Sequence, residues 1–262
     1  MNVVKIQGGL GNQLFQWALS RYLMLEGYDT YIDISQYSNQ QGMTQRAFQL
    51  SVFPNCKYKL LSDFLQNNNH SNINLTQMTD DFVYKNLSVD NIYLNGYWQS
   101  EKYFKKYEDI IREELIPSSE IQFKLLEKYN DLNSNSVSLH VRRGDYVRQQ
   151  GHHPLQPIEY YKNAIIQIGD YDVLYIFSDD IQWCMENLNF KNMVFVNNDS
   201  DEEDIWHMSM CKHNIIANSS FSWWGAWLNS NPDKKVITPI TWFGPNIQVP
   251  TNDIIPNEWI KL

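Results

Sequence analysis

The sequence predicts an α/β fold whose C-terminal half is a doubly wound parallel sheet. From Ser136 onward, short apolar runs alternate with segments that have the periodicity of amphipathic helices. Such alternation is typical of parallel strands joined by helices that cover both faces of a sheet. The expected strands span residues 137–141, 173–177, 193–196, 214–217 and 235–238. The expected helices span residues 158–168, 181–188, 202–211 and 221–228.

The N-terminal half begins with a similar unit. A short apolar strand at residues 3–6 runs into a glycine-rich loop at residues 8–13, and an amphipathic helix follows. The apolar side chains assigned to this helix are Leu14, Phe15, Trp17, Ala18, Tyr22, Leu23 and Leu25. The loop is a weak sign of dinucleotide binding, because it lacks both the Rossmann glycine spacing and the Lys-Ser/Thr pair of a P-loop. The Asn-rich polar stretch at residues 65–81 is expected to be a loop.

Length and composition allow either one large domain or two small ones. The chain has 262 residues, of which 43% are hydrophobic, and this content is sufficient for substantial cores. A polar segment at residues 131–135 separates the first half from the regular second half. We therefore expect two domains, residues 1–132 and residues 133–262.

Two consecutive arginines, Arg142 and Arg143, follow the first strand of the regular half in a chain with a formal net charge of -9. At the edge of a sheet, the planar guanidinium group of Arg142 suits the oxygens of a phosphate. The structural alternative is an ion pair with one of the 30 acidic residues. A pI near 5.1 argues against nucleic acid as the anionic partner, since nucleic acid requires an extended basic face.

Polar residues follow the expected strands at the edge where parallel sheets bind ligands. They are residues 142–143, 178–180, 197–198 and 218–220. A phosphate fits between Arg142, the hydroxyl groups of Ser219 and Ser220, and the N-terminus of the helix that these serines open. The carboxylates of Asp179 and Asp180 suit the N–H edge of a guanine or a ribose hydroxyl. For the Ser, Asp and Asn residues the alternative is helix N-capping, which these residue types favour.

Three of these strand-end segments, at residues 140–146, 178–180 and 218–227, form a set with three further segments at residues 8–15, 96–100 and 256–259. Together they resemble the motifs of the α-1,2-fucosyltransferases, family eleven of the glycosyltransferases. The resemblance spans the chain, and it is the combination of motifs that is specific.

The resemblance implies two facing Rossmann-like domains of the GT-B type with the active cleft between them. The N-terminal domain would lie on the acceptor side and the C-terminal domain would bind GDP-fucose. The implied reaction is an inverting transfer of L-fucose to the 2-hydroxyl of a terminal galactose, on an oligosaccharide or a lipid-linked glycan. No metal and no cofactor is expected.

For this reaction, Arg142 and His140 are expected to stabilise the departing GDP. Asn12 resembles the asparagine that completes the site in related fucosyltransferases. The proton of the acceptor hydroxyl needs a base, and Asp145 and His153 are both candidates by position. The expected donor-binding residues are Gly9, Gly11, Asn12, His140, Arg142, Ser178, Asp179, Asp180, Asn218, Ser219, Ser220 and Phe221.

Trp98 and Gln99 are the expected acceptor-binding residues. Trp98 stands between a turn at residues 95–96 and an amphipathic helix expected from residue 100. Its ring therefore either stacks on a sugar or packs against the protein, and the sequence leaves both alternatives open.

Two other functions are compatible with these residues. A non-catalytic sugar-binding or nucleotide-binding module would keep Arg142 and the aromatic residues without needing a base. A metal-dependent transferase would use an Asp-x-Asp pair, and such pairs begin at Asp170 and at Asp199. So short a pattern arises often by chance in an acidic chain, and Arg142 already provides a cation for the departing phosphate.

The sequence contains no apolar run of the ~20 residues that span a bilayer, and residues 1–6 do not form a signal peptide. A bacterial enzyme of the cytoplasm, free or peripherally attached to the inner membrane, is expected. The three cysteines lack metal-like spacing and are expected to be free thiols. The oligomeric state is left open.

Overall fold

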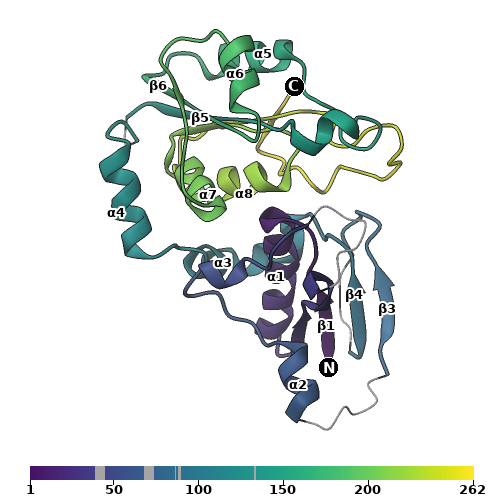
Figure 1. The fold of residues 1–262 in the computed structure, drawn as a ribbon. Coiled ribbons are helices and arrows are strands. Elements are labelled where there is room, and N and C mark those ends of the chain that lie inside the picture. Colours follow the sequence, from purple (N-terminus) through teal and green to yellow (C-terminus); the bar gives the residue numbers. More distant parts are fainter. Residues whose placement is uncertain (39–44, 68–73, 86, 88–89, 133) are drawn as a thin grey trace. The chain divides into compact units, whose positions relative to one another are not determined.

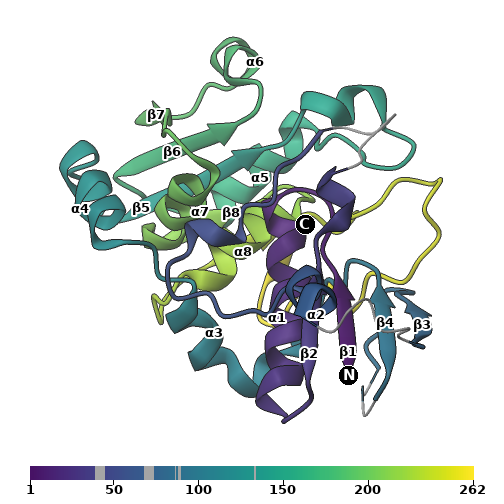
Figure 2. The ribbon, with the colours of Figure 1, turned by 60° about the horizontal axis from the view of Figure 1, so that its bottom comes forward.

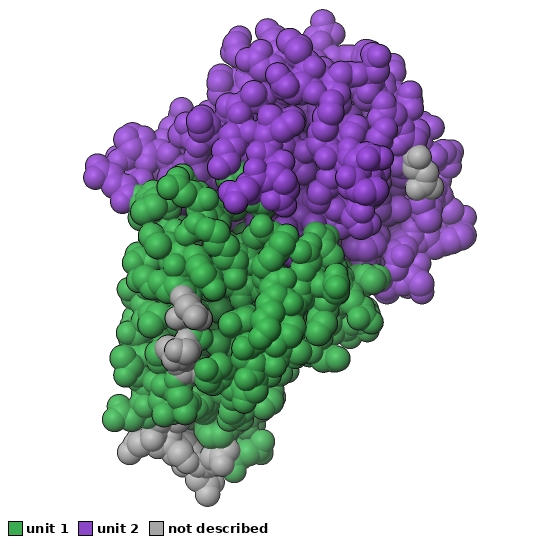
Figure 3. Space-filling model, turned by 180° about the vertical axis from the view of Figure 1, so that it is seen from behind, with its two compact units in different colours: residues 1–116, 249–256 green, residues 117–248, 257–262 purple. Residues whose placement is uncertain are grey.

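The computed structural model describes residues 1–38, 45–67, 74–85, 87, 90–132 and 134–262. The chain, drawn in Figure 1, forms two compact units, which are coloured separately in Figure 3. Unit 1 comprises Met1–Ile116 and Val249–Pro256, and unit 2 comprises Pro117–Gln248 and Asn257–Leu262. The boundary therefore lies before the expected one at 132/133, and residue 133 itself lies outside the described residues.

The boundary differs because a helix that precedes the polar link belongs to unit 2. Helix α4 spans Ser119–Lys128, and its Leu125 is completely buried. Leu125, Tyr129 and Leu132 pack in one cluster with Val173 and other side chains of the second sheet. The polar segment thus lies within unit 2, and its polarity did not mark a boundary between the units.

The sheet of unit 2 has six strands, and every neighbouring pair is parallel. The strands are β5 (Ser136–Val141), β6 (Val173–Ser178), β7 (Met193–Phe195), β8 (His213–Ile215), β9 (Val236–Thr238) and β10 (Ile260–Lys261). The first five coincide with the expected strands to within one or two residues at most ends. Strand β10 was not expected, since two exposed residues carry no strand pattern.

Helices cover both faces of this sheet, as Figure 1 shows, with α5 and α6 on one side and α7 and α8 on the other. The helices are α5 (Ile158–Ile168), α6 (Ile181–Asn187), α7 (Asp201–Met210) and α8 (Ser220–Leu228). Strand β6 shows why two layers form, because alternate side chains of a strand point to opposite faces. Leu174 and Ile176 pack with α5, whereas Tyr175 and Phe177 pack on the face of α7. The doubly wound parallel sheet is therefore confirmed.

The strand order of unit 2 is β10-β9-β8-β5-β6-β7. From β5 the chain proceeds outward to β6 and β7, and then it returns to build β8, β9 and β10 on the other side. Doubly wound sheets bind ligands where the strand order reverses, outside the carboxyl ends of the strands. In this sheet that point lies between β5 and β8, which are followed by Arg142 and Asn218 respectively.

Unit 1 contains a four-stranded parallel sheet with the order β2-β1-β4-β3, whose side-by-side strands are visible in Figure 2. The strands are β1 (Asn2–Lys5), β2 (Thr30–Asp33), β3 (Thr76–Thr79) and β4 (Ile92–Asn95). The helices are α1 (Leu10–Leu25), α2 (Leu61–Asn67) and α3 (Glu108–Glu114). Short 3-10 helices span Ser35–Ser38, Leu50–Val52, Glu101–Tyr103 and Lys105–Tyr107 in unit 1, and Gly144–Arg148 in unit 2.

The stretch at residues 65–81 is not the loop that its composition predicted. It contains the end of α2 and the whole of β3, although residues 68–73 lie outside the described residues. Strand β3 is an edge strand, and its sequence Thr-Gln-Met-Thr leaves three of four side chains exposed. Backbone pairing with β4 stabilises this strand. Because that pairing does not depend on apolar side chains, the sequence shows no alternation of apolar and polar residues there.

Cys56, Cys184 and Cys211 are free thiols. Among the helices in the described ranges, none is long and apolar enough to cross a membrane.

A buried ion pair joins helices α1 and α3 within unit 1. The guanidinium group of Arg21 makes three hydrogen bonds to the Glu114 carboxylate: Nη2 donates to Oε1 at 2.7 Å, and Nε donates to Oε2 at 2.8 Å and to Oε1 at 3.0 Å. Both residues are buried, and the exposed Lys57 lies 3.7 Å from the same carboxylate. Both charges are desolvated, so each depends on the other for compensation.

Replacing Arg21 by Met is therefore expected to reduce the free energy of unfolding by about 3–5 kcal/mol, because the Glu114 carboxylate remains buried without its main partner. The double variant Arg21→Met/Glu114→Leu is expected to recover most of this loss. Urea unfolding followed by circular dichroism checks both values. A double variant as unstable as the single one would show that packing, not charge compensation, is what Arg21 contributes.

Candidate active site

The two arginines after β5 stand opposite two aspartates after β6. The parallel register of these strands pairs Val141 with Ser178, so the residues that follow come side by side. Arg142 Nη1 lies 2.8 Å from Asp179 Oδ2, and Arg143 Nε lies 3.0 Å from Asp180 Oδ2. The backbone N–H of Arg143 also donates to Asp179 Oδ1 at 2.8 Å. The ion pairs foreseen as an alternative therefore exist, and they fix both arginines at the sheet edge.

Arg142 has a second carboxylate partner and an aromatic neighbour. Its Nη2 lies 2.5 Å from Asp145 Oδ1, and its guanidinium carbon lies 5.2 Å from the centre of the Tyr146 ring. Burial opposes the charged form, but Asp179 and Asp145 outweigh it and raise the pKa of Arg142. A guanidinium group has five N–H donors, so these contacts leave donors for a ligand. The side chain is 21% exposed, which leaves it accessible.

The turn after Arg143 requires a glycine. A side chain at Gly144 would clash with Asp179 Oδ2, the oxygen that pairs with Arg142. The absence of a Cβ atom thus lets the carboxylate approach the arginine.

His140 is a neutral, buried imidazole beside this charged group. The residue is 5% exposed, and burial, followed by repulsion from Arg142, lowers its pKa to about 3. Its Nδ1 atom has no hydrogen-bond partner among the described residues, and its ring lies 5.8 Å from that of Phe221. A neutral imidazole carries one donor and one acceptor, so His140 can donate a hydrogen bond without contributing charge.

The two candidate bases both lie close to Tyr146. Asp145 accepts the hydrogen bond from Arg142, and the His153 ring stacks on the Tyr146 ring at 4.7 Å with an interplanar angle of 16°. Burial lowers the pKa of His153, while Asp145 acts in the opposite direction. The Nδ1 atom of His153 has no hydrogen-bond partner within the described ranges. The structure brings both candidates to one place, and the choice between them stays open.

Asn218 connects two loops to the carboxyl end of β8. Its Nδ2 donates to the carbonyl oxygens of Pro154 at 3.1 Å and Trp242 at 3.0 Å, and its Oδ1 accepts from Gln156 at 3.0 Å. The backbone oxygen of Asn218 accepts from the Tyr146 hydroxyl at 3.2 Å. These bonds use both amide hydrogens, so the side chain supports the loops; its contact with the sugar-nucleotide donor stays a prediction.

Helix capping explains part of the polar strand ends. Ser219 caps α8 by accepting from the Phe221 N–H at 3.3 Å, and Asp180 caps α6 by accepting from the Trp183 N–H at 3.2 Å. Ser178 accepts from the Asp180 N–H at 3.0 Å. Capping satisfies backbone donors with one lone pair of each oxygen and does not exclude a ligand. Ser220 opens α8, whose N-terminus lies at the same edge as Arg142.

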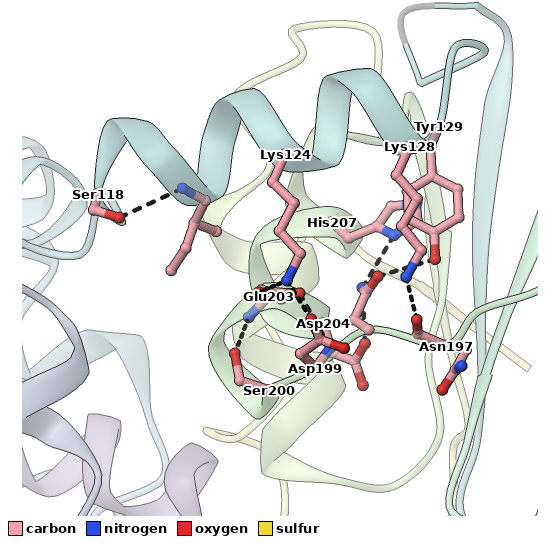
Figure 4. A network of polar contacts seen from close by, with 12 residues as sticks. Ser118, Lys124, Lys128, Tyr129, Asn197, Asp199, Ser200, Glu203, Asp204 and His207 are labelled. Atoms are coloured by element: carbon pink, nitrogen blue, oxygen red, sulfur yellow. Dashed lines mark hydrogen bonds and ion pairs between the residues drawn. The ribbon is translucent and has the colours of Figure 1, made fainter.

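Asn197 and Asn198, also counted among the strand-end residues, belong to a network that joins α4 to the loop after β7 (Figure 4). The Asn198 amide donates to Asp204 Oδ1 at 2.9 Å and accepts from the Tyr129 hydroxyl at 2.9 Å. The carbonyl oxygen of Asn197 accepts from Lys128. These two asparagines therefore have structural partners.

The Asp-x-Asp pairs also have local partners. Asp170 lies 3.7 Å from Lys191, and Asp199 lies 2.6 Å from Lys124. Across the described ranges, no group of three or more His, Cys, Asp or Glu residues is arranged to hold a metal ion.

In unit 1, the glycine-rich loop places Asn12 inside α1. The N-cap of α1 is Gly9, without a side-chain cap, so Asn12 does not cap the helix. The Asn12 Oδ1 atom instead accepts from Gln99 Nε2 at 2.8 Å. A Cβ atom at Gly8, where φ is 80°, would lie 2.8 Å from Asn12 Nδ2, so the loop packs tightly against this amide. Gly11 is buried in the first turn of α1.

The two expected acceptor-binding residues are both buried. Trp98 is 1% exposed and its ring lies 5.6 Å from that of Tyr103 in an edge-to-face arrangement. Gln99 is 9% exposed, and its Oε1 atom has no partner in the part of the chain that the structure describes. The structure thus shows packing for Trp98 and offers no free ring face, and contact of Trp98 with a sugar stays a prediction.

Comparison with known proteins gives a family and several relatives. The model of glycosyl transferase family 11 matches residues 1–262. The O-antigen biosynthesis glycosyltransferase WbnK of Escherichia coli is 33% identical over 307 aligned positions, which cover 98% of this chain and 99% of that protein. The alpha-1,2-colitosyltransferase of E. coli is 32% identical, covering 99% and 98%. The galactoside alpha-(1,2)-fucosyltransferase 2 of Oryctolagus cuniculus is 24% identical, covering 87% and 67%.

The environment of His140 predicts its behaviour in solution. Because its pKa of about 3 lies far below the ordinary 6.5, its ring resonances are expected to stay constant in an NMR titration from about pH 8 to pH 5. The neutral His140 ring contributes to the free energy of unfolding in full above its ordinary pKa of 6.5, and this contribution decreases as the pH falls from there toward 3. The His140→Gln variant identifies the resonances. A midpoint near 6.5 would contradict the buried, neutral state.

Proposed function

This chain belongs to glycosyl transferase family 11, and on that premise we propose that it is an α-1,2-fucosyltransferase. It transfers L-fucose from GDP-fucose to the 2-hydroxyl of a terminal galactose, with inversion at the anomeric carbon. The observation that supports this proposal most is the position of Arg142 at the carboxyl end of β5, where the strand order reverses. A fixed cation there suits a diphosphate.

The proposed chemistry is a direct displacement. The acceptor oxygen attacks the anomeric carbon, the bond from that carbon to the β-phosphate oxygen breaks, and GDP leaves with the electron pair. Arg142 stabilises the negative charge that develops on the phosphate, and His140 donates a hydrogen bond to it. Asp145 or His153 takes the proton of the acceptor hydroxyl. The proposed remaining donor contacts are Gly9, Gly11, Ser178, Asp179, Asp180, Ser219, Ser220 and Phe221.

A second donor is favoured by one relative, the alpha-1,2-colitosyltransferase, which matches almost the full chain. Colitose is fucose without its 3-hydroxyl group, so the two donors differ in a single hydrogen-bonding group. A site built to bind that hydroxyl discriminates strongly against its absence, whereas an apolar site discriminates weakly. Fucose remains the first proposal, because the family resemblance and the rabbit relative both name it.

For the acceptor, we propose a galactose-terminated oligosaccharide or lipid-linked glycan, reached in the cytoplasm or at the inner membrane surface. The relative named for O-antigen biosynthesis supports a glycan of this kind.

One experiment separates these functions. The protein is incubated with lactose and either GDP-fucose or GDP-colitose, with and without EDTA, and GDP release and the product linkage are measured. An α-1,2-fucosylated product that survives EDTA supports the proposal. Binding without GDP release would indicate a binding module, turnover abolished by EDTA would indicate a metal-dependent transferase, and turnover with GDP-colitose alone would assign the other donor.

Replacing Arg142 by Ala is expected to lower kcat by roughly two to three orders of magnitude, the scale for losing one preorganised charge-stabilising group. Steady-state kinetics on the variant measure this loss. Arg143→Ala is a matched control, because Arg143 has similar exposure and also pairs with an aspartate. Its loss is expected to be much smaller. Equal losses in both variants would point to disruption of the ion pairs and would remove the phosphate role of Arg142.

Asn12 is proposed to act in the same reaction, and two substitutions test this. Asn12→Ala is expected to depress kcat strongly while GDP affinity, measured by calorimetry, changes little. Asn12→Asp keeps the oxygen that accepts from Gln99 and removes the amide donor. If the amide hydrogen contacts substrate, both variants lose turnover. If Asn12 serves only to hold Gln99, Asn12→Asp keeps its turnover, and the catalytic proposal fails.

A further inference from the structure

The turn after β4 is held by a half-buried carboxylate, Asp80, that no motif identified. Asp80 directly follows β3, whose last residue Thr79 is paired with Asn95 at the end of β4. Asp80 Oδ2 accepts from the Trp98 N–H at 2.7 Å, and its Oδ1 accepts from the Phe82 N–H at 2.8 Å. Burial raises the pKa of Asp80, although these backbone bonds act in the opposite direction. The carboxylate therefore connects two neighbouring strand ends.

Trp98 has an unusual backbone conformation in this turn. Its φ is 53°, in the left-handed region, which a bulky side chain adopts at a cost of about 1–3 kcal/mol. Such a conformation persists where its surroundings determine it from several sides. A side chain at Gly96 would overlap with Asp80, so the backbone there needs a glycine. Gln16 Nε2 donates to the Gly96 carbonyl oxygen at 3.0 Å, which fixes the turn from α1 as well.

As a consequence, two neighbouring aromatic side chains of the turn differ in their exposure to solvent. Trp98 is 1% exposed, whereas Tyr97 is 38% exposed. The Tyr97 hydroxyl has no hydrogen-bond partner in the described part of the chain. The turn thus buries the tryptophan and presents the tyrosine.

Tyr97 lies at the same edge of unit 1 as the glycine-rich loop. The Tyr37 hydroxyl donates to the Gly8 carbonyl oxygen at 3.0 Å. Burial chiefly, and the charge of the nearby Tyr97 in addition, raise the pKa of Tyr37. The residue after Trp98, Gln99, bonds to Asn12 at 2.8 Å. Tyr97 therefore belongs to a turn that contacts α1 through Gly96 and Gln99.

We propose that Tyr97 stacks on the galactose ring of the acceptor and that Asp80 is the positioning residue that presents it. This inference rests on the proposed function. Galactose has an apolar face of C–H groups, and an aromatic ring with a polar tip covers such a face while its hydroxyl bonds to the sugar. A turn held from two strands and a helix keeps the ring in place before the sugar binds, which reduces the ordering cost of binding.

The first test compares Tyr97→Ala with Tyr84→Ala, a control of the same residue type that is also 38% exposed in unit 1 and lies outside the turn. Tyr97→Ala is expected to raise KM for lactose by about tenfold, the upper part of the range for an aromatic contact, with KM for the donor unchanged. Tyr97→Phe should keep most of the affinity. Unchanged acceptor KM in Tyr97→Ala, or the same rise in Tyr84→Ala, would overturn the assignment.

A binding measurement keeps this test separate from the proposed function. Saturation-transfer NMR with lactose reports sugar binding to the wild type and to the variants without any turnover. Loss of the signal in Tyr97→Ala alone supports the stacking role even if neither sugar nucleotide is a donor. Absence of transfer by the wild type would defeat the proposed function alone. Equal lactose signals in wild type and Tyr97→Ala would defeat the stacking role alone.

The second test addresses Asp80. Asp80→Asn keeps the size of the side chain but leaves one oxygen to accept from two N–H groups, so acceptor KM should rise as in Tyr97→Ala while GDP affinity stays constant. In the double variant Asp80→Asn/Tyr97→Ala, KM should be no higher than in Tyr97→Ala, because residues that act through one another are not additive. The positioning role would be contradicted if the increases in KM of the two single variants multiplied in the double variant. A loss of GDP affinity in Asp80→Asn would contradict it as well.

Discussion

The parallel register of β5 and β6 is the constraint on which the candidate site of unit 2 depends. It sets two consecutive arginines against two consecutive aspartates at the point where both strands end. In an acidic chain this arrangement holds two ordered guanidinium groups at the sheet edge before any ligand is present. Other local features follow from it. Gly144 has no side chain because Asp179 occupies that space, and His140 stays neutral because it is buried next to a fixed cation. Preorganised charge of this kind needs little rearrangement when a phosphate becomes more negative.

Most of unit 2 was predicted from the sequence, because short apolar strand segments and the helical spacing of apolar residues are both clear there. Helix α5 was predicted to the residue, and β6 to within one residue. Three of the elements that were not predicted have weak patterns: β3 is polar and exposed, β10 has two residues, and α4 adjoins a polar turn that resembles a linker. Their stability comes from pairing or packing with segments far away in the chain. Local composition does not carry that information.

The candidate site shows the same division between local and distant causes. Arg142 was identified from its place after a strand, and its partner Asp145 lies only three residues away. Its other partner, Asp179, required the register between two strands. The choice between Tyr97 and Trp98 was not accessible to sequence reasoning, because the two are aromatic neighbours in one motif. A backbone dihedral decides which ring is buried, and Asp80, eighteen residues earlier in the chain, holds that dihedral.

The division of the chain into units has a consequence for how the protein is made. The chain passes from unit 1 to unit 2, returns for Val249–Pro256, and then finishes the sheet of unit 2 with Asn257–Leu262. The returning segment contributes Asp253, which accepts from the Tyr84 N–H, and the final segment brings Trp259 to within 5.5 Å of Trp223. Domains formed from one continuous stretch fold in turn as they leave the ribosome. Here unit 1 receives Val249–Pro256 only after Pro117–Gln248 of unit 2 have been synthesised, so unit 1 cannot complete its fold before most of unit 2 has been made.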